Sequence, residues 1–105
     1  NNPDIVNRFS RAILKAMDYR DANMDEAVEI VAKLNGTPAD SVSAEKETAI
    51  WFTSNDIKKA YSDGSAERWY EAQQKIFINS EVIKEPVNVS DYVRFDLIDS
   101  LFNIN

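Results

Sequence analysis

NMDEAVEIVAKLNG, residues 23–36, is the stretch of sequence that decides the fold class. Asn23, followed three residues later by Glu26, has the form of a capping box with Asn in place of Ser or Thr. Gly36 supplies a left-handed stop, and Pro38 prevents the helix from continuing. Between these signals the apolar residues recur at the spacing of one helix face: Ala27, Ile30, Val31 and Leu34. The stretch therefore predicts a capped amphipathic helix.

A second helix is predicted on the N-terminal side of this stretch. Asn2 can cap the free amides of a helix, and Pro3 suits the first helical position. We expect this helix to end near Tyr19. Its apolar residues also follow helical spacing: Ile5, Phe9, Ile13, Ala16 and Met17.

On the C-terminal side, Ser43 and Ser65 are predicted to cap two further helices. A short helical turn is expected after Pro38, another short helix over residues 55–61, and a turn at Asp63-Gly64. The apolar positions of the helix after Ser43 are Ala44, Thr48, Trp51 and Phe52. Those of the helix after Ser65 are Trp69, Ala72, Ile76 and Phe77.

The last part of the chain combines a loop with a final helix. Residues 82–89 alternate poorly and are interrupted by Pro86, so an extended loop is expected. Ser90 is predicted to cap a helix with the apolar residues Tyr92, Phe95, Ile98, Leu101 and Phe102. No strand is predicted. The expected fold class is all-α with about five or six helices, in a single helical domain or fragment over residues 1–105.

The composition fits one small helical domain and excludes several functions. The chain has 105 residues, of which 44% are hydrophobic and only 2 are Gly, too few for a turn-rich all-β fold. The net charge of −6 argues against binding to nucleic acid or to an anionic membrane surface. Cys and His are absent, so we expect no catalytic residue, no metal site and no cofactor. No apolar run reaches the ~20 residues of a membrane span, and no signal peptide is recognised.

Few side chains suggest chemistry. Trp51 and Trp69 can stack on a flat ligand, but their place on apolar helix faces favours core packing. Arg68 is expected on the solvated side. The serines lack a histidine to activate them. The acidic groups do not match a calcium loop and are interpreted as helix caps and solvated faces: Asp18, Asp21, Asp25 and Glu26; Glu45 and Glu47; Asp96 and Asp99.

Several short motifs, in order along the chain, resemble one protein family. They are the start Asn2-Pro3-Asp4-Ile5-Val6-Asn7-Arg8-Phe9 with Ala12-Ile13 and Ala16, then Asn23-Met24-Asp25-Glu26-Ala27, then Asp63-Gly64-Ser65-Ala66-Glu67-Arg68-Trp69, and finally Ile83, Pro86-Val87 and Asp91-Tyr92. Together they resemble the C-terminal helical region of periplasmic ABC-transporter solute-binding proteins of the nitrate, sulfonate, taurine and thiamine-precursor class. Two stretches depart from that pattern: residues 79–81 lack the usual glycine, and residues 96–99 lack a threonine-asparagine pair.

The resemblance implies a two-lobed α/β parent protein that captures a small solute and delivers it to a membrane permease. It also implies a periplasmic or extracellular, membrane-anchored location. The sheets and most pocket residues would lie upstream, so the ligand-binding residues stay unknown. We expect no tight solute binding by this chain alone. We also expect self-association, such as a homodimer, through the apolar faces of the first and last helices.

Two alternatives remain open. One is an independent all-helical protein-interaction domain, with a partner bound in an exposed apolar groove. The other is part of a protein similar to the synthases of the thiamine pyrimidine. Those synthases use histidine chemistry, which this chain cannot supply.

Overall fold

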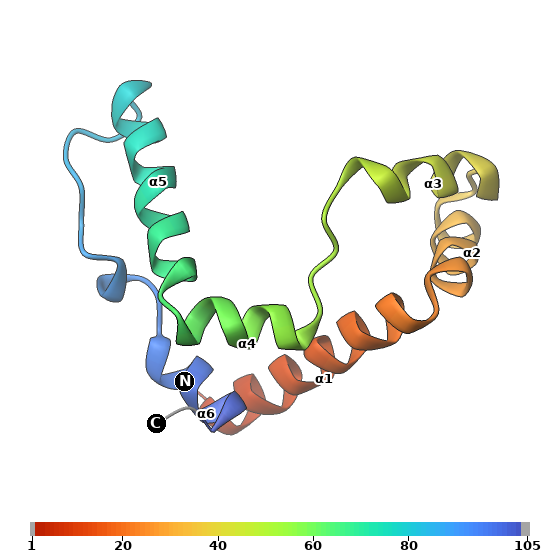
Figure 1. Cartoon of the computed structure of the whole chain (residues 1–105), viewed down its shortest axis with the longest axis horizontal. Coiled ribbons are helices and arrows are strands. Elements are labelled where there is room, and N and C mark those ends of the chain that lie inside the picture. Colours follow the sequence, from red (N-terminus) through yellow and green to blue (C-terminus); the bar gives the residue numbers. More distant parts are fainter. Residues whose placement is uncertain (1, 104–105) are drawn as a thin grey trace. The chain divides into compact units, whose positions relative to one another are not determined.

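The computed structural model describes residues 2–103, and this part of the chain is all-helical, without strands (Figure 1). The α-helices are α1 (Pro3–Ala22), α2 (Met24–Asn35), α3 (Ala39–Glu45), α4 (Ser54–Ser62), α5 (Ser65–Asn79) and α6 (Phe95–Phe102). Two short 3₁₀ helices are η1 (Lys46–Thr48) and η2 (Val89–Asp91). The predicted fold class, all-α with five or six helices, is confirmed.

The chain divides into two compact units, Asn1–Asn55 and Asp56–Asn105. The first unit contains α1 to η1 and the segment that follows. The second contains most of α4, then α5, η2 and α6. The expectation of a single helical domain or fragment over residues 1–105 stays a prediction.

The junction of α1 and α2 differs from the predicted capping box. The Asn23 side chain makes no capping hydrogen bond to α2. Instead its Nδ2 donates to the Tyr19 carbonyl at 3.0 Å, and its backbone amide donates to the same oxygen at 2.9 Å. The Glu26 carboxylate accepts from the Tyr19 hydroxyl at 2.6 Å. Asn23 therefore closes α1, which extends to Ala22, beyond the predicted end near Tyr19.

The predicted stop of α2 is confirmed. Gly36 has a φ of 64°, and its amide donates to the Ala32 carbonyl. The Thr37 amide donates to the same carbonyl at 3.0 Å. Since a residue with a Cβ is strained at positive φ, Gly suits this position. Pro38 then precedes α3.

Helix α1 begins at Pro3 as predicted, but four predicted capping residues differ in detail from the structure. Ser43 lies inside α3, because the helix already begins after Pro38, and Trp51 lies on a non-helical segment. Asn2 precedes α1 but its side chain makes no capping bond. Ser65 is the first residue of α5, and its amide donates to Asp63 Oδ1 at 2.8 Å. Ser90 lies in η2, and α6 begins later, at Phe95.

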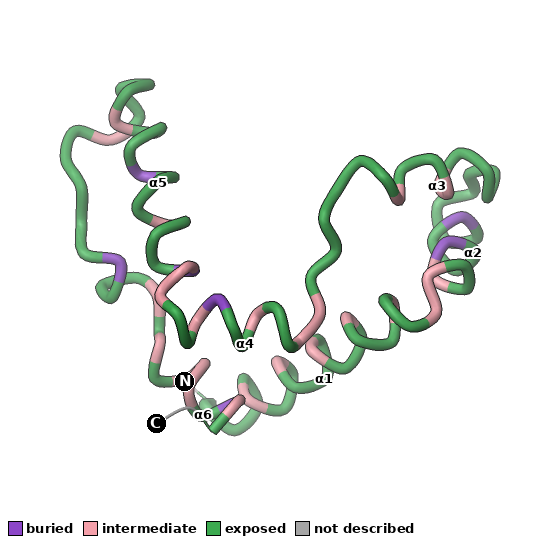
Figure 2. Tube along the Cα trace, viewed as in Figure 1, coloured by how far each residue is buried: buried purple, intermediate pink, exposed green. Residues whose placement is uncertain are grey.

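Few side chains are buried, and in α2 and α5 they lie on faces that differ from the predicted ones (Figure 2). In α2 the buried residues are Val28 and Ala32, whereas Leu34 is 79% exposed. In α5 the buried residues are Ala66 and Gln74, spaced by two helical turns, and the predicted core residue Trp69 is exposed. The predicted apolar stripes are therefore largely solvent-exposed: Ile5, Phe9, Ile13, Ile30, Val31, Trp51, Phe52, Ile76 and Phe77.

In the last helix, α6, the residues predicted to be apolar and inward-facing are buried or half-buried. Leu101 is buried, and Phe95, Ile98 and Phe102 are half-buried. Its apolar face is thus partly covered within the unit, and the expectation that α6 contributes to self-association stays a prediction. The first helix does expose its apolar face, because α1 contains no buried residue.

Candidate functional site

Gln74 is the buried polar side chain that organises the second unit. It projects from α5 with 7% of its surface exposed. Its Nε2 donates to the Val87 carbonyl and to the Tyr92 hydroxyl, each at 2.9 Å. Its Oε1 accepts from the Val87 amide at 2.8 Å. The carboxamide thus pairs with the backbone of Val87 as a neighbouring strand would, and all of its bonds hold the loop against the helix.

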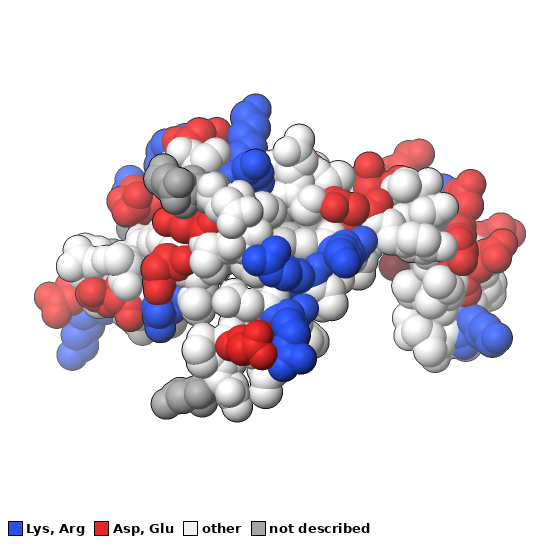
Figure 3. All heavy atoms as spheres, turned by 90° about the horizontal axis from the view of Figure 1, so that it is seen from below, with Lys and Arg blue, Asp and Glu red and all other residues white. Residues whose placement is uncertain are grey.

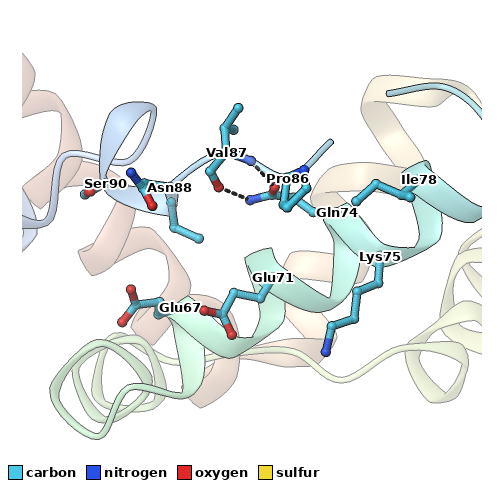
Figure 4. A pocket seen from close by; sticks show the side chains of 10 residues that line it. Glu67, Glu71, Gln74, Lys75, Ile78, Pro86, Val87, Asn88 and Ser90 are labelled. Carbon is cyan, nitrogen blue, oxygen red and sulfur yellow. Dashed lines mark hydrogen bonds between the residues drawn. The ribbon is translucent and has the colours of Figure 1, made fainter. Parts of the chain in front are cut away.

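A cleft of about 530 Å³ lies between α5 and this loop (Figure 4). Figure 4 shows Glu67, Glu71 and Lys75 on the helix side and Asn88 and Ser90 on the loop side. Its volume is within the range of small-molecule sites. The glutamates and the lysine are exposed, however, so the charges stay largely hydrated. The cleft depends on Gln74 for its loop wall, because Gln74 holds the Val87 backbone in place.

Tyr92, which accepts a hydrogen bond from Gln74, is part of an aromatic cluster. The Tyr61 and Tyr70 hydroxyl oxygens are 3.2 Å apart, and Tyr61 packs edge-on against Phe95 with ring centroids separated by 5.8 Å. Tyr70 packs edge-on against Tyr92 at 6.0 Å. Burial and the hydrogen bond to Tyr70 raise the pKa of Tyr61 to about 12, so the phenol stays neutral. The cluster connects α4, α5, η2 and α6.

The first unit has a smaller apolar pocket of about 140 Å³ closed by Trp51. The Trp51 ring lies 5.0 Å from the Arg20 guanidinium carbon, a cation–π distance. Trp51 Nε1 donates to the Lys46 carbonyl at 2.7 Å, and Arg20 Nη2 donates to the Phe52 carbonyl at 2.9 Å. Glu45 and Lys46 line part of the remaining wall, and the rest is apolar and comes from Met24, Ala27, Val28, Val31 and Val42.

Trp51 therefore does not pack in a core as predicted, and it does not present a free ring face to a ligand on the side where Arg20 lies. It is 40% exposed, so it is not a core residue, and its ring face is already used by Arg20. Trp69 is 51% exposed, and core packing is wrong for it as well. Arg68 lies on the exposed side as expected, where its Nη2 donates to Ser65 Oγ at 2.9 Å.

The start of α4 is fixed by Asp18 of α1. Its Oδ1 accepts from the Ser54 amide at 2.7 Å, and its Oδ2 accepts from Ser54 Oγ at 2.6 Å. These two bonds lower the pKa of the Asp18 carboxyl below its ordinary value. A carboxylate from a neighbouring helix thus takes the role that a capping side chain usually plays.

Two further acidic side chains each form one ion pair. Asp25 accepts from Lys46 Nζ at 3.1 Å, and Asp96 pairs with Arg94 at 2.6 Å. The Arg94 side chain holds the pKa of the Asp96 carboxyl below its ordinary value. Over residues 2–103, no three acidic side chains come together as a group that could hold a metal ion. Figure 3 shows acidic side chains at several places on this face, among them the part that α2 and α3 occupy.

Sequence reasoning predicted neither the cleft beside Gln74 nor the pocket beside Trp51. Gln74 was not a candidate because its partners, Val87 and Tyr92, lie 13 and 18 residues further along the chain. The one available signal is that Ala66, Tyr70, Gln74 and Ile78 recur every four residues, so that Gln74 shares a helix face with apolar side chains.

The chain is similar to proteins of the genus Brucella. It is 30% identical over 95 residues to proteins of Brucella abortus (strain 2308), Brucella suis biovar 1 and Brucella melitensis biotype 1, each named "putative binding protein". The matched region covers 90% of this chain but about 30% of the length of these curated relatives. No family model matches the chain. No solved structure matches it either. Among the described residues, no helix is both long enough and apolar enough to cross a membrane.

Replacing Gln74 should loosen the second unit. We expect Gln74→Ala to lower the free energy of unfolding by about 3 kcal/mol, because three hydrogen bonds are lost at about 1 kcal/mol each. Urea unfolding followed by circular dichroism measures this change. Gln74→Glu keeps the shape, but an ionised carboxylate has no proton to donate to the Val87 carbonyl, so this variant should also be destabilised at neutral pH. The matched control is Gln73→Ala on the exposed face, and an equal loss in that control would contradict a special role for Gln74.

The Asp18–Ser54 contact should make stability depend on pH. Because the pKa of Asp18 is lowered in the folded state, its contribution is present above the unfolded-state pKa of about 3.9 and is lost as pH falls through the lower folded value. Asp18→Asn should therefore lower the thermal midpoint at neutral pH, and the difference from wild type should shrink in acid. Asp21→Asn removes the same charge from an exposed position and serves as control. A difference that is independent of pH would refute the assignment.

Proposed function

We propose that this chain is the C-terminal helical portion of an ABC-transporter substrate-binding protein. The observation that carries the proposal is the similarity to longer proteins that are named as binding proteins, over 90% of this chain. The ordered motifs at Asn2-Pro3, Asn23 to Ala27 and Asp63 to Trp69 support the finer assignment to a solute-binding protein, because they resemble the end of that class.

Exposed apolar residues in the second unit give independent support. Trp69 and Ile76 lie on the outer face of α5, and 51% and 62% of their surfaces are exposed. Val82, just beyond the helix, is 67% exposed. Exposed apolar residues that lie together on a surface often mark an interface with another part of a protein. In the proposed parent this stripe packs against the lobe that carries the sheets.

The proposed parent captures a small solute of the nitrate, sulfonate, taurine or thiamine-precursor type. It delivers the solute to a membrane permease, in the periplasm or while anchored outside the cell membrane. We propose that it acts without catalysis and without a cofactor. The cleft beside Gln74 and the pocket under Trp51 are open on one side, so we assign neither as the solute site.

Two other functions compete with this proposal. An independent helical interaction domain is favoured by the exposed apolar residues, which offer a surface to a partner. A role as part of a thiamine-pyrimidine synthase-like protein would need catalytic histidines outside this chain, which has none.

The chain alone should bind solutes weakly, because a solute-binding protein buries its ligand between two lobes and this chain offers at most one wall. Calorimetry with nitrate, taurine, an alkyl sulfonate and a thiamine pyrimidine precursor should give dissociation constants no tighter than about millimolar. The product of the complete reading frame should bind one of these solutes in the micromolar range.

Two results would count against the proposal. One is micromolar binding by this chain alone, which would place a complete site on it. The other is a complete reading frame that ends with these helices and binds none of the solutes, which would favour the interaction domain. Catalytic turnover of a thiamine precursor by the complete product would favour the synthase-like alternative.

A further inference from the structure

Asn35 is the one asparagine of the chain that is followed by glycine. It is the last residue of α2, and Gly36 beyond it has a φ of 64°. Both residues are exposed. A Cβ placed on Gly36 would meet nothing within 4 Å, so no other part of the chain crowds this position. The pair therefore combines an amide side chain with an unobstructed neighbouring backbone.

An asparagine side chain before glycine can react with the backbone. The Gly36 amide nitrogen attacks Cγ of Asn35, so that a new N–Cγ bond forms, the bond from Cγ to Nδ2 breaks, and Nδ2 leaves as ammonia with the amide proton. One water molecule then opens the resulting five-membered succinimide ring. Cleavage at Cγ gives aspartate, and cleavage at the backbone carbonyl carbon gives isoaspartate, in which the chain runs through Cβ. Either product carries one negative charge that Asn35 lacks.

In the folded chain the Gly36 amide is engaged in the stop of α2. It donates to the Ala32 carbonyl, and the Thr37 amide donates to the same oxygen at 3.0 Å. The nitrogen can attack only after its bond to Ala32 opens. Little opposes that opening, because residues 33–41 are all exposed, whereas the buried residues of α2 lie further back in the helix. Segments with few buried contacts open locally, without unfolding of the rest.

The other glycine of the chain has different surroundings. Gly64 follows Asp63, whose Oδ1 accepts from the Ser65 amide at 2.8 Å. The hydrogen bonds from Ser65 hold the pKa of the Asp63 carboxyl below its ordinary value, and an ionised carboxylate is a poor target for a nitrogen nucleophile. A Cβ placed on Gly64 would also lie 3.2 Å from Arg68 Nη1, so this position is crowded. Asp63 therefore serves as an unreactive reference within the same chain.

We propose that Asn35 is a site of spontaneous covalent modification, at which opening of the last turn of α2 converts the asparagine into aspartate and isoaspartate. The isoaspartate adds one atom to the backbone before Gly36, so the Gly36 and Thr37 amides no longer both reach the Ala32 carbonyl. The added charge lies at the C-terminal end of α2, where the helix dipole disfavours a negative group. The modification thus removes the stop of the helix.

The consequence reaches the pocket beside Trp51. Helix α2 packs against α3, and the pocket takes walls from both: Val28 and Val31 from α2, and Val42 from α3. Because the stop at Gly36 joins the two helices, its loss loosens the pair and exposes Trp51 further. This inference does not rest on the proposed function, because it uses contacts within the first unit alone.

Mass spectrometry of the full chain, kept folded in mildly alkaline buffer, provides the test. The wild type should gain about one dalton, located in the peptide that contains Asn35. The rate should rise with pH, because attack requires loss of the amide proton. Asn35→Gln should abolish the gain, since a glutamine side chain would have to form a larger ring. The peptide that contains Asp63 should show no isoaspartate.

Two variants separate local opening from general destabilisation. Leu34→Gly lowers helix propensity in the last turn of α2 at a position that is 79% exposed, and should speed the conversion about threefold. Ile76→Gly makes the same kind of change at an exposed position of α5, and should leave the rate within about twofold. In a Trp69→Phe background, the converted fraction separated by ion exchange should show red-shifted emission from Trp51.

Four outcomes would overturn the proposal. The first is a folded chain that gains no mass while the urea-unfolded chain converts completely. The second is a gain that persists in Asn35→Gln, and the third is equal acceleration by Leu34→Gly and Ile76→Gly. The fourth, unchanged Trp51 emission in the converted fraction, would overturn the effect on the pocket.

Discussion

In each unit of this protein, side chains of a helix hold the backbone of a segment that has no regular structure of its own. The Gln74 carboxamide does this in the second unit, with one bond to the Val87 amide and one to its carbonyl. These bonds attach the Val87 backbone to α5 and so decide where the loop lies. The cleft, the position of Tyr92 and the aromatic cluster around Tyr70 all follow from that placement.

In the first unit, charged side chains hold the backbone of the segment before α4 and of the first residue of α4. Asp18 holds the start of α4 through Ser54, and Arg20 holds Phe52 through its carbonyl. These contacts are polar and lie near the surface, whereas the buried apolar side chains of α2 are small. Much of the large apolar area of both units therefore remains on the outside. That imbalance underlies the proposal of a larger parent protein, since exposed apolar strips favour association.

The helices were predictable from the sequence, because a helix is specified locally. The 3.6-residue period and the stop at Gly36 depend on residues a few positions apart. The buried faces were not predictable, because they depend on which neighbour the helix meets, and Leu34 has the pattern of a core residue but lies outside. The prediction of capping residues was wrong for a related reason. Asn23 lies between two helices, and its side chain bonds to α1 rather than to α2. The candidate site was hidden because Gln74 acts on partners far along the chain, which no local pattern reveals.

We propose that the exposed apolar face of α5, which includes Trp69 and Ile76, is covered by the rest of a longer solute-binding protein. The most direct measurement is the solvent exposure of Trp69, followed by fluorine NMR of protein labelled with 5-fluorotryptophan and assigned with Trp69→Phe. The account predicts that the Trp69 resonance shows a large solvent isotope shift in this chain, where 51% of the side chain is exposed, and loses it in the product of the complete reading frame. An isotope shift of the same size in both proteins would contradict the account.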